Sequence, residues 1–195
     1  MRALIVVLLF AVTAYATAPK LLLPTLGGTI AEVYPSGSGT ANVLVCATVP
    51  AEHGLANVSK IAFYNPGTQS LSDTCAAAVY PDSDGGTKLG GVSAPCAAGV
   101  ISATGLTPFS ITEGTLYRIC VCSTAGNTTT KYLAVRDDYG TAGNYHLPAL
   151  GNTFATHYGA GANTCTSGVL PSTTGALTPY TQSSFKRIPV ILLEQ

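Results

Sequence analysis

The sequence predicts an all-β protein, an antiparallel β-sandwich cross-linked by disulfide bonds, and three observations support this. No stretch of helix length keeps apolar residues at spacings of three and four, because glycine or proline interrupts nearly every window. Short stretches of strand length recur instead, with turn-forming residues between them. The 6 cysteines all follow an N-terminal segment typical of exported proteins, where an even number of cysteines indicates disulfides.

The strand candidates are rich in apolar and β-branched residues and are separated by glycine, proline, asparagine and aspartate. They are the segments 28–34, 42–49, 58–64, 76–80, 99–106, 115–122, 131–135, 152–158 and 188–194. Many short strands with such turns are typical of a sandwich or barrel, not of a parallel sheet linked by helices. The last strand is apolar on both faces up to Glu194, which predicts a place in the middle of a sheet or under a covering loop. We expect one jelly-roll-like domain over 17–195.

The first residues have the three parts of a secretory signal peptide. Arg2 precedes an apolar run over 3–12, and small residues lead to Ala16. Cleavage after Ala18 would leave Pro19 first, which signal peptidases disfavour, so we expect residues 1–16 to be removed. The alternatives are a buried N-terminal strand or a retained helix. The run is too short for a membrane anchor, so we expect a secreted protein on a cell or particle surface, without a membrane span after cleavage.

The composition argues against electrostatic recruitment to nucleic acid or to an anionic membrane. Charged residues make up 9% of the chain, against a typical value of about a quarter. The formal net charge is 0, and no basic tract or acidic tail is present in the sequence. No nucleic-acid partner is therefore expected.

Cys120 and Cys122 are one residue apart in a predicted strand, so their side chains share one face. A structural zinc site prefers Cys-x2–4-Cys loops that wrap around the ion, and an extended Cys-x-Cys does not wrap. A thioredoxin-type site needs Cys-x-x-Cys at the start of a helix. Disulfides fit this pair better, and neither a metal nor a cofactor is expected.

The cysteine spacing suggests three bridges. Cys75 and Cys96 enclose a hairpin-like segment and are expected to pair, which would stabilise the fold by roughly 3 kcal/mol in the chain-entropy model. Cys120 and Cys122 are each expected to pair with one of two further cysteines. The remaining two are Cys46 and Cys165. The order of these last two bridges stays open at this stage.

Two groups of acidic residues and histidines are candidates for a catalytic or metal site. Asp82 and Asp84, followed by glycine, resemble the start of a calcium loop, but the later glutamate is missing and a hairpin turn is favoured. A second group matches no metalloenzyme or nucleophile motif and is interpreted as solvated loop residues. That group comprises Asp137, Asp138, His146 and His157. No catalytic residue is assigned, so the protein is expected not to be an enzyme.

The segment 136–165 is the expected location of any ligand-binding surface. It combines aromatic rings, amides and imidazoles with many glycines and little strand propensity. Rings beside amides suit sugar faces, and loops on a rigid frame commonly carry binding sites. The candidate residues are Tyr139, Asn144, Tyr145, His146, His157 and Tyr158. The alternative is a glycine-rich cover over one sheet, with the tyrosines buried at its edge.

Four stretches resemble β-sandwich domains of bacteriophage virion and tail proteins and of bacterial surface proteins. They are "AVYPDSDGGTKL", "GLTPFSITEGTLYRICVCST", "NTCTSGVLPSTTGALT" and "RIPVILLEQ". The pattern Leu-x-x-Gly-x-x-Tyr entering a central strand is matched by Ile111, Gly114 and Tyr117, with isoleucine in the leucine position. The resemblance covers about residues 55–195 and implies a structural or receptor-facing role without catalysis. A signal peptide departs from the phage pattern, because virion proteins assemble in the cytoplasm.

The leading hypothesis is therefore a non-enzymatic extracellular protein with a structural or adhesive role, whose partner is a glycan or a cell-surface receptor. A second hypothesis is a subunit of an extracellular fibre or virion particle, which self-associates by strand pairing. The pairing segment would then be 188–194 or the N-terminal 21–33. A third hypothesis is a secreted polysaccharide hydrolase.

Overall fold

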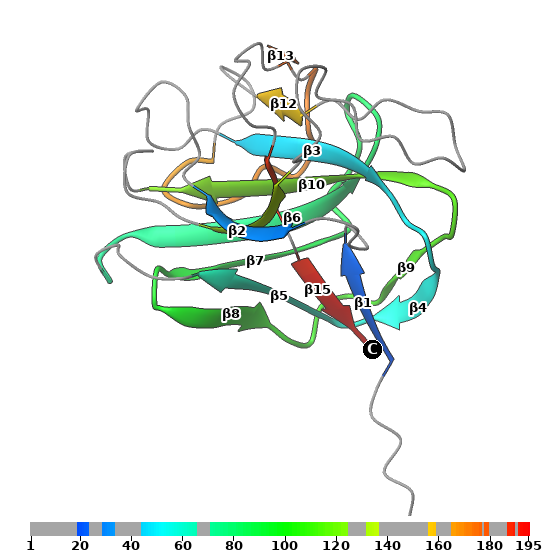
Figure 1. Cartoon of the computed structure of the whole chain (residues 1–195), viewed down its shortest axis with the longest axis horizontal. Coiled ribbons are helices and arrows are strands. Elements are labelled where there is room, and N and C mark those ends of the chain that lie inside the picture. Colours follow the sequence, from blue (N-terminus) through cyan, green and yellow to red (C-terminus); the bar gives the residue numbers. More distant parts are fainter. Residues whose placement is uncertain are drawn as a thin grey trace, which may run out of the picture.

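The computed structural model describes residues 19–23, 29–33, 44–65, 71–124, 132–136, 156–158, 165–176, 178–179, 187–189 and 191–195. These segments form strands joined by turns and bends, and none of them is a helix that could cross a membrane (Figure 1). The strands are β1 (Lys20–Leu23), β2 (Thr29–Val33), β3 (Val45–Pro50), β4 (Leu55–Val58), β5 (Lys60–Asn65), β6 (Thr74–Pro81), β7 (Gly90–Pro95), β8 (Gly99–Ala103), β9 (Phe109–Ile111), β10 (Leu116–Ser123), β11 (Tyr132–Arg136), β12 (Thr156–Tyr158), β13 (Thr178–Pro179), β14 (Arg187–Pro189) and β15 (Ile191–Glu194).

The strands form four sheets in which neighbours pair antiparallel. The largest sheet has the order β13-β12-β3-β10-β6-β7, and a four-stranded sheet has the order β1-β15-β5-β8. A three-stranded sheet, β14-β11-β2, and the pair β4-β9 complete the described topology. The prediction of an all-β, antiparallel fold is confirmed. The predicted strand 188–194 is divided between two sheets: residues 188–189 belong to β14, and residues 191–194 form β15. The strand β15 lies between β1 and β5, as its two apolar faces predicted.

The largest hydrophobic cluster draws on both the six-stranded and the four-stranded sheet. Ile119 and Val79 lie opposite each other on β10 and β6, and both are fully buried in this cluster. Ile61, Ile191 and Leu193 contribute from β5 and β15. Burial of this apolar surface is the main stabilising contribution to the fold. The two sheets therefore share one core.

The opposite face of the six-stranded sheet carries a second buried cluster. Its members are Leu44, Cys46, Ala76, Ala78, Tyr80, Cys120, Cys122, Cys165 and Leu170. Cys120 and Cys122 are both in it, so the expectation that they share a face is confirmed. Because one cluster lies on each face, the six central residues of β6 are all buried.

The pattern Ile111, Gly114, Tyr117 builds the turn from β9 into β10. Gly114 has a φ of 75°, a conformation that favours glycine, and its N–H donates to the Ala51 carbonyl at 2.8 Å. The Tyr117 hydroxyl oxygen accepts the N–H of Thr112 at 2.8 Å. Ile111 and Tyr117 are both buried in the large cluster. The turn thus fixes where β10 enters the sheet.

All six cysteines form disulfides, which settles the order that the sequence left open. The predicted Cys75–Cys96 bridge is present and joins the start of β6 to the residue after β7. Cys46 bonds to Cys120, its direct neighbour across β3 and β10. Cys122 bonds to Cys165 and so attaches the segment 165–176 to β10.

Candidate functional site

Most of the predicted binding segment lies outside the described residues. This applies to Tyr139, Asn144, Tyr145 and His146, and also to Asp137 and Asp138. His157 and Tyr158 belong to β12, of which the structure describes the backbone only. The register places His157 opposite Cys46 of β3, beside the Cys46–Cys120 bridge.

The strands β11 and β12 and one disulfide hold this segment at three places. Arg136, at its start, ends β11 and lies opposite Thr29 and Arg187. The strand β12 pairs with β3 and so extends the six-stranded sheet. Cys165, at its end, is fixed to β10 by the disulfide to Cys122. Any binding surface formed by the segment would therefore rest on a cross-linked frame.

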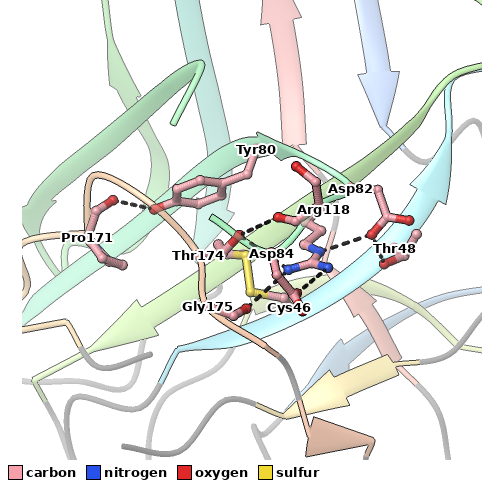
Figure 2. The surroundings of a disulfide bond; sticks show 11 residues. Cys46, Thr48, Tyr80, Asp82, Asp84, Arg118, Pro171, Thr174 and Gly175 are labelled. Atoms are coloured by element: carbon pink, nitrogen blue, oxygen red, sulfur yellow. Dashed lines mark hydrogen bonds and ion pairs between the residues drawn. A yellow bond between two sulfur atoms is a disulfide. The ribbon is translucent and has the colours of Figure 1, made fainter. Parts of the chain in front are cut away.

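A cluster of polar and charged side chains surrounds Arg118, next to the Cys46–Cys120 bridge (Figure 2). Arg118 is only 8% exposed and lies on the same face of β10 as the two cysteines. Its Nε atom is 3.0 Å from Asp82 Oδ1, and its Nη2 atom is 3.0 Å from Asp84 Oδ1. The cluster thus places one buried cation between two carboxylates.

The remaining donors of the guanidinium point to the segment 165–176. Nη1 donates to the Thr174 hydroxyl oxygen at 3.3 Å and to the Gly175 carbonyl at 3.2 Å. The Thr48 hydroxyl donates to Asp82 Oδ1 at 3.0 Å, which completes the contacts of that carboxylate with β3. A buried guanidinium is tolerated only when its donors are paired, and its planar fork suits several acceptors at once.

The loop between β6 and β7 carries both aspartates. Its turn is closed by the Gly86 N–H, which donates to the Ser83 carbonyl at 3.0 Å, and Gly85 has a φ of 79°. The predicted hairpin turn is confirmed, since β6 and β7 pair antiparallel on either side. The carboxylates of Asp82 and Asp84 face Arg118, and no group of three metal-ligating side chains occurs within the described segments.

The segment 165–176 runs across this loop and across the outer face of the sheet. The Gly85 N–H donates to the Thr174 carbonyl at 2.6 Å, and the Lys88 N–H donates to the Ser172 carbonyl at 2.7 Å. The Tyr80 hydroxyl donates to the Pro171 carbonyl at 2.8 Å, and burial raises the pKa of this hydroxyl. Tyr80 is therefore a neutral donor at physiological pH, fixed to the segment.

Small residues on β6 and β7 make room for the segment. At Gly91 an added Cβ atom would lie 3.0 Å from Leu170 Cδ1 and 3.1 Å from the Ala78 Cβ atom. Leu170 is only 5% exposed, because it packs directly onto the sheet at this glycine. The Ser93 hydroxyl donates to the Gly168 carbonyl at 2.7 Å on the same face. The alanine-rich and glycine-rich sequence of these strands therefore has a packing reason.

A separate ion-pair row joins the chain ends across the four-stranded sheet. Glu194 of β15 lies opposite Lys20 of β1 and Lys60 of β5. Its carboxylate oxygens are 3.1 Å from Lys20 Nζ and 2.9 Å from Lys60 Nζ. Hydrogen bonds from Lys60 and then Lys20 hold the pKa of the Glu194 carboxyl below its ordinary value. At neutral pH the Glu194 carboxyl is therefore ionised.

Arg118 was not predicted from the sequence to be a functional or structural centre. A usable signal was present, because Arg118 shares its strand face with Leu116, Cys120 and Cys122. A lone arginine on such a face needs acidic partners, and two aspartates lie in a predicted turn of the neighbouring strand. The arrangement orders the β6–β7 loop and the segment 165–176.

In comparisons with protein-family models and with curated proteins, no family model and no curated protein matches this chain.

Proposed function

We propose that this protein is a secreted or surface-exposed, non-enzymatic β-sandwich of jelly-roll type with a structural or adhesive role. The observation that carries the proposal is the set of three disulfides, whose cysteines are each no more than 1% exposed. Disulfides persist mainly in oxidising compartments, which supports an extracellular location. A sandwich is supported by the core that the six-stranded and four-stranded sheets share.

The binding role is proposed for the segment 136–165, with a glycan or a cell-surface receptor as the partner. Support comes from the frame, since β11, β12 and the Cys122–Cys165 bridge hold this segment at three places. Loops fixed on a rigid sheet are common positions for binding residues. The resemblance to β-sandwich domains of virion and surface proteins points in the same direction.

Export is the first part to test. The mature protein is expected to begin at Thr17, because Ala14, Tyr15 and Ala16 form a small-x-small cleavage site and Pro19 disfavours the next one. The intact mass of the secreted, non-reduced protein decides this and also counts the disulfides. A product that retains Met1 would contradict export.

Ligand binding is tested by replacing Tyr139, Tyr145 and Tyr158 with alanine, one at a time. Each loss of a stacked ring is expected to weaken binding about fivefold, equivalent to about 1 kcal/mol, in a glycan-array or cell-surface assay. Tyr64→Ala is the matched control, because Tyr64 is a 43% exposed tyrosine on β5 and is not part of the segment 136–165.

The thermal melting temperature and the disulfide content of each variant separate binding from folding. Binding that falls in the three variants while melting stays near the wild-type value supports the proposal. Unfolding of all three variants would show that the tyrosines are part of a core, and the segment would then be a structural cover.

A polysaccharide hydrolase remains the competing class, and Asp137 and His146 are its test. Loss of polysaccharide turnover on replacing either residue would favour the enzyme. Among the described carboxylates, Asp82 and Asp84 are committed to ion pairs with Arg118, so they are poor candidates for an acid and base pair. A fibre subunit that pairs through residues 191–194 is not favoured either, because these residues form β15, which is already paired on both sides within the chain.

A further inference from the structure

The strand β8 is an edge strand of the four-stranded sheet and lies at the lower margin of the molecule in Figure 1. It pairs with β5 in a continuous register from Asn65 opposite Gly99 to Ile61 opposite Ala103. Beyond this ladder, no hydrogen bond involving residues 99–103 occurs in the part of the chain that the structure describes. An edge strand presents alternate N–H and C=O groups that can pair with another chain.

This edge lacks the features that usually prevent such pairing. Charged side chains, prolines and bulges protect the edges of natural sheets. The strand β8 has the sequence GVISA, and the whole stretch 89–112 contains no charged residue. The opposite edge strand, β1, instead carries Lys20, which is ion-paired with Glu194. The edge strand β7 ends at Pro95, and its Ser93 side chain is bonded to the Gly168 carbonyl.

The outer face of β8 also exposes apolar surface next to the open edge. Val100 is 70% exposed and lies opposite Tyr64 of β5, which is 43% exposed. On the inner face Ile101 is 5% exposed and belongs to the shared core. The position of β8 is thus fixed by the core, while its edge and one apolar side chain face solvent.

We propose that two copies of this chain associate by antiparallel pairing of their β8 strands about Ile101, so that two four-stranded sheets become one continuous sheet. Val100 of one copy then lies opposite Ser102 of the other, and no like charges face each other. Removal of residues 1–16 takes away Arg2, so 8 basic and 9 acidic residues remain and the formal net charge of the mature chain is −1; overall repulsion between copies is therefore small. An uncharged, self-complementary edge favours a second copy over a partner that is selected by charge.

The symmetry of this contact determines the oligomeric state, and its size determines the strength of association. An antiparallel pair of identical strands is isologous, so it closes into a dimer and does not extend into a fibre. A contact made by two five-residue strands is smaller than a standard stable interface, so we expect a weak dimer with a dissociation constant on the order of micromolar or weaker. This inference does not depend on the ligand proposed above.

The test is sedimentation equilibrium of the secreted, disulfide-bonded protein from about 1 µM to about 1 mM. The wild type is expected to shift from monomer to dimer in this range, and Val100→Lys to raise the dissociation constant about tenfold or more. Val169→Lys is the matched control, because Val169 is 65% exposed but lies outside β8. Ser102→Lys is a second edge variant, expected to behave like Val100→Lys.

Hydrogen exchange of the backbone amides gives the location of the contact. The amides of 99–103 are expected to gain protection as the wild-type concentration rises, with no such gain in Val100→Lys. A wild type that stays monomeric throughout would overturn the proposal. So would a dimer that Val100→Lys and Val169→Lys weaken equally, or one whose protected amides lie outside β8.

Discussion

Replacing Cys46 and Cys120 together by alanine is expected to lower the free energy of unfolding by about 4 kcal/mol. The bridge closes a loop with a sequence separation of 74 residues, so its loss frees a long stretch of the unfolded chain. Denaturant unfolding of the non-reduced variant and wild type, followed by tyrosine fluorescence, measures the change. The fold is expected to remain, because the backbone ladder between β3 and β10 is intact.

The double variant Cys75→Ala/Cys96→Ala is the control for this explanation. Its loop has a sequence separation of only 21 residues, so the same entropy model gives a loss about 1 kcal/mol smaller. Both variants remove two almost fully buried sulfur atoms, and their packing losses are therefore similar. Equal losses, or a larger loss for the shorter loop, would show that native packing dominates over the entropy of the unfolded chain.

The strands that the sequence revealed are those whose own side chains favour a pleated sheet. The predicted 115–122 is β10 (Leu116–Ser123), and the predicted 76–80 lies within β6 (Thr74–Pro81). The strand β7 (Gly90–Pro95), with the sequence GGVSAP, was missed because glycine and proline are poor strand formers. Its glycines are explained only by tertiary packing, since Gly91 lies beneath Leu170 from far along the chain.

The cysteine pairing was predictable in outline, and the register decided the rest. Cys120 and Cys122 both face one side of β10, so either could reach Cys46 or Cys165 on sequence grounds. In the sheet Cys46 lies directly opposite Cys120, which leaves Cys122 for Cys165. Register between strands far apart in sequence depends on the whole pattern of buried faces, and a single strand does not reveal it.

The Arg118 cluster was not predicted because the residues around Arg118 come from three separate places in the sequence. Asp82 and Asp84 lie in the β6–β7 loop, Thr48 on β3, and Thr174 in the segment 165–176. Each of these residues alone is an ordinary polar residue of a turn or strand. Only the order β3-β10-β6, together with the Cys122–Cys165 bridge, brings them to one guanidinium.

Arg118→Ala is expected to lower the free energy of unfolding by about 3 kcal/mol, because removing one member of a buried ion pair leaves its partners without compensation. Asp82 loses its ion pair with Arg118, and because its side chain is only 26% exposed, solvent compensates this loss only in part. The Thr174 hydroxyl and the Gly175 carbonyl each lose a donor as well. Denaturant unfolding measures the loss, and faster amide exchange at Gly85, Lys88 and Thr174 would report loosening of the segment 165–176.

Two further substitutions in this cluster distinguish the effect of the Arg118 charge from the effect of its planar guanidinium. Asp84→Asn is expected to cost less than about 1 kcal/mol, because the Asp84 side chain is 61% exposed and its ion pair is screened by solvent. Arg118→Lys keeps the charge but offers no planar fork, so it should recover only part of the loss. If Arg118→Ala costs no more than Asp84→Asn, the guanidinium contributes only as a surface charge would. The Cys122–Cys165 bridge, the backbone hydrogen bonds to the β6–β7 loop and the packing of Leu170 would then hold the segment 165–176 on the sheet without a contribution from Arg118.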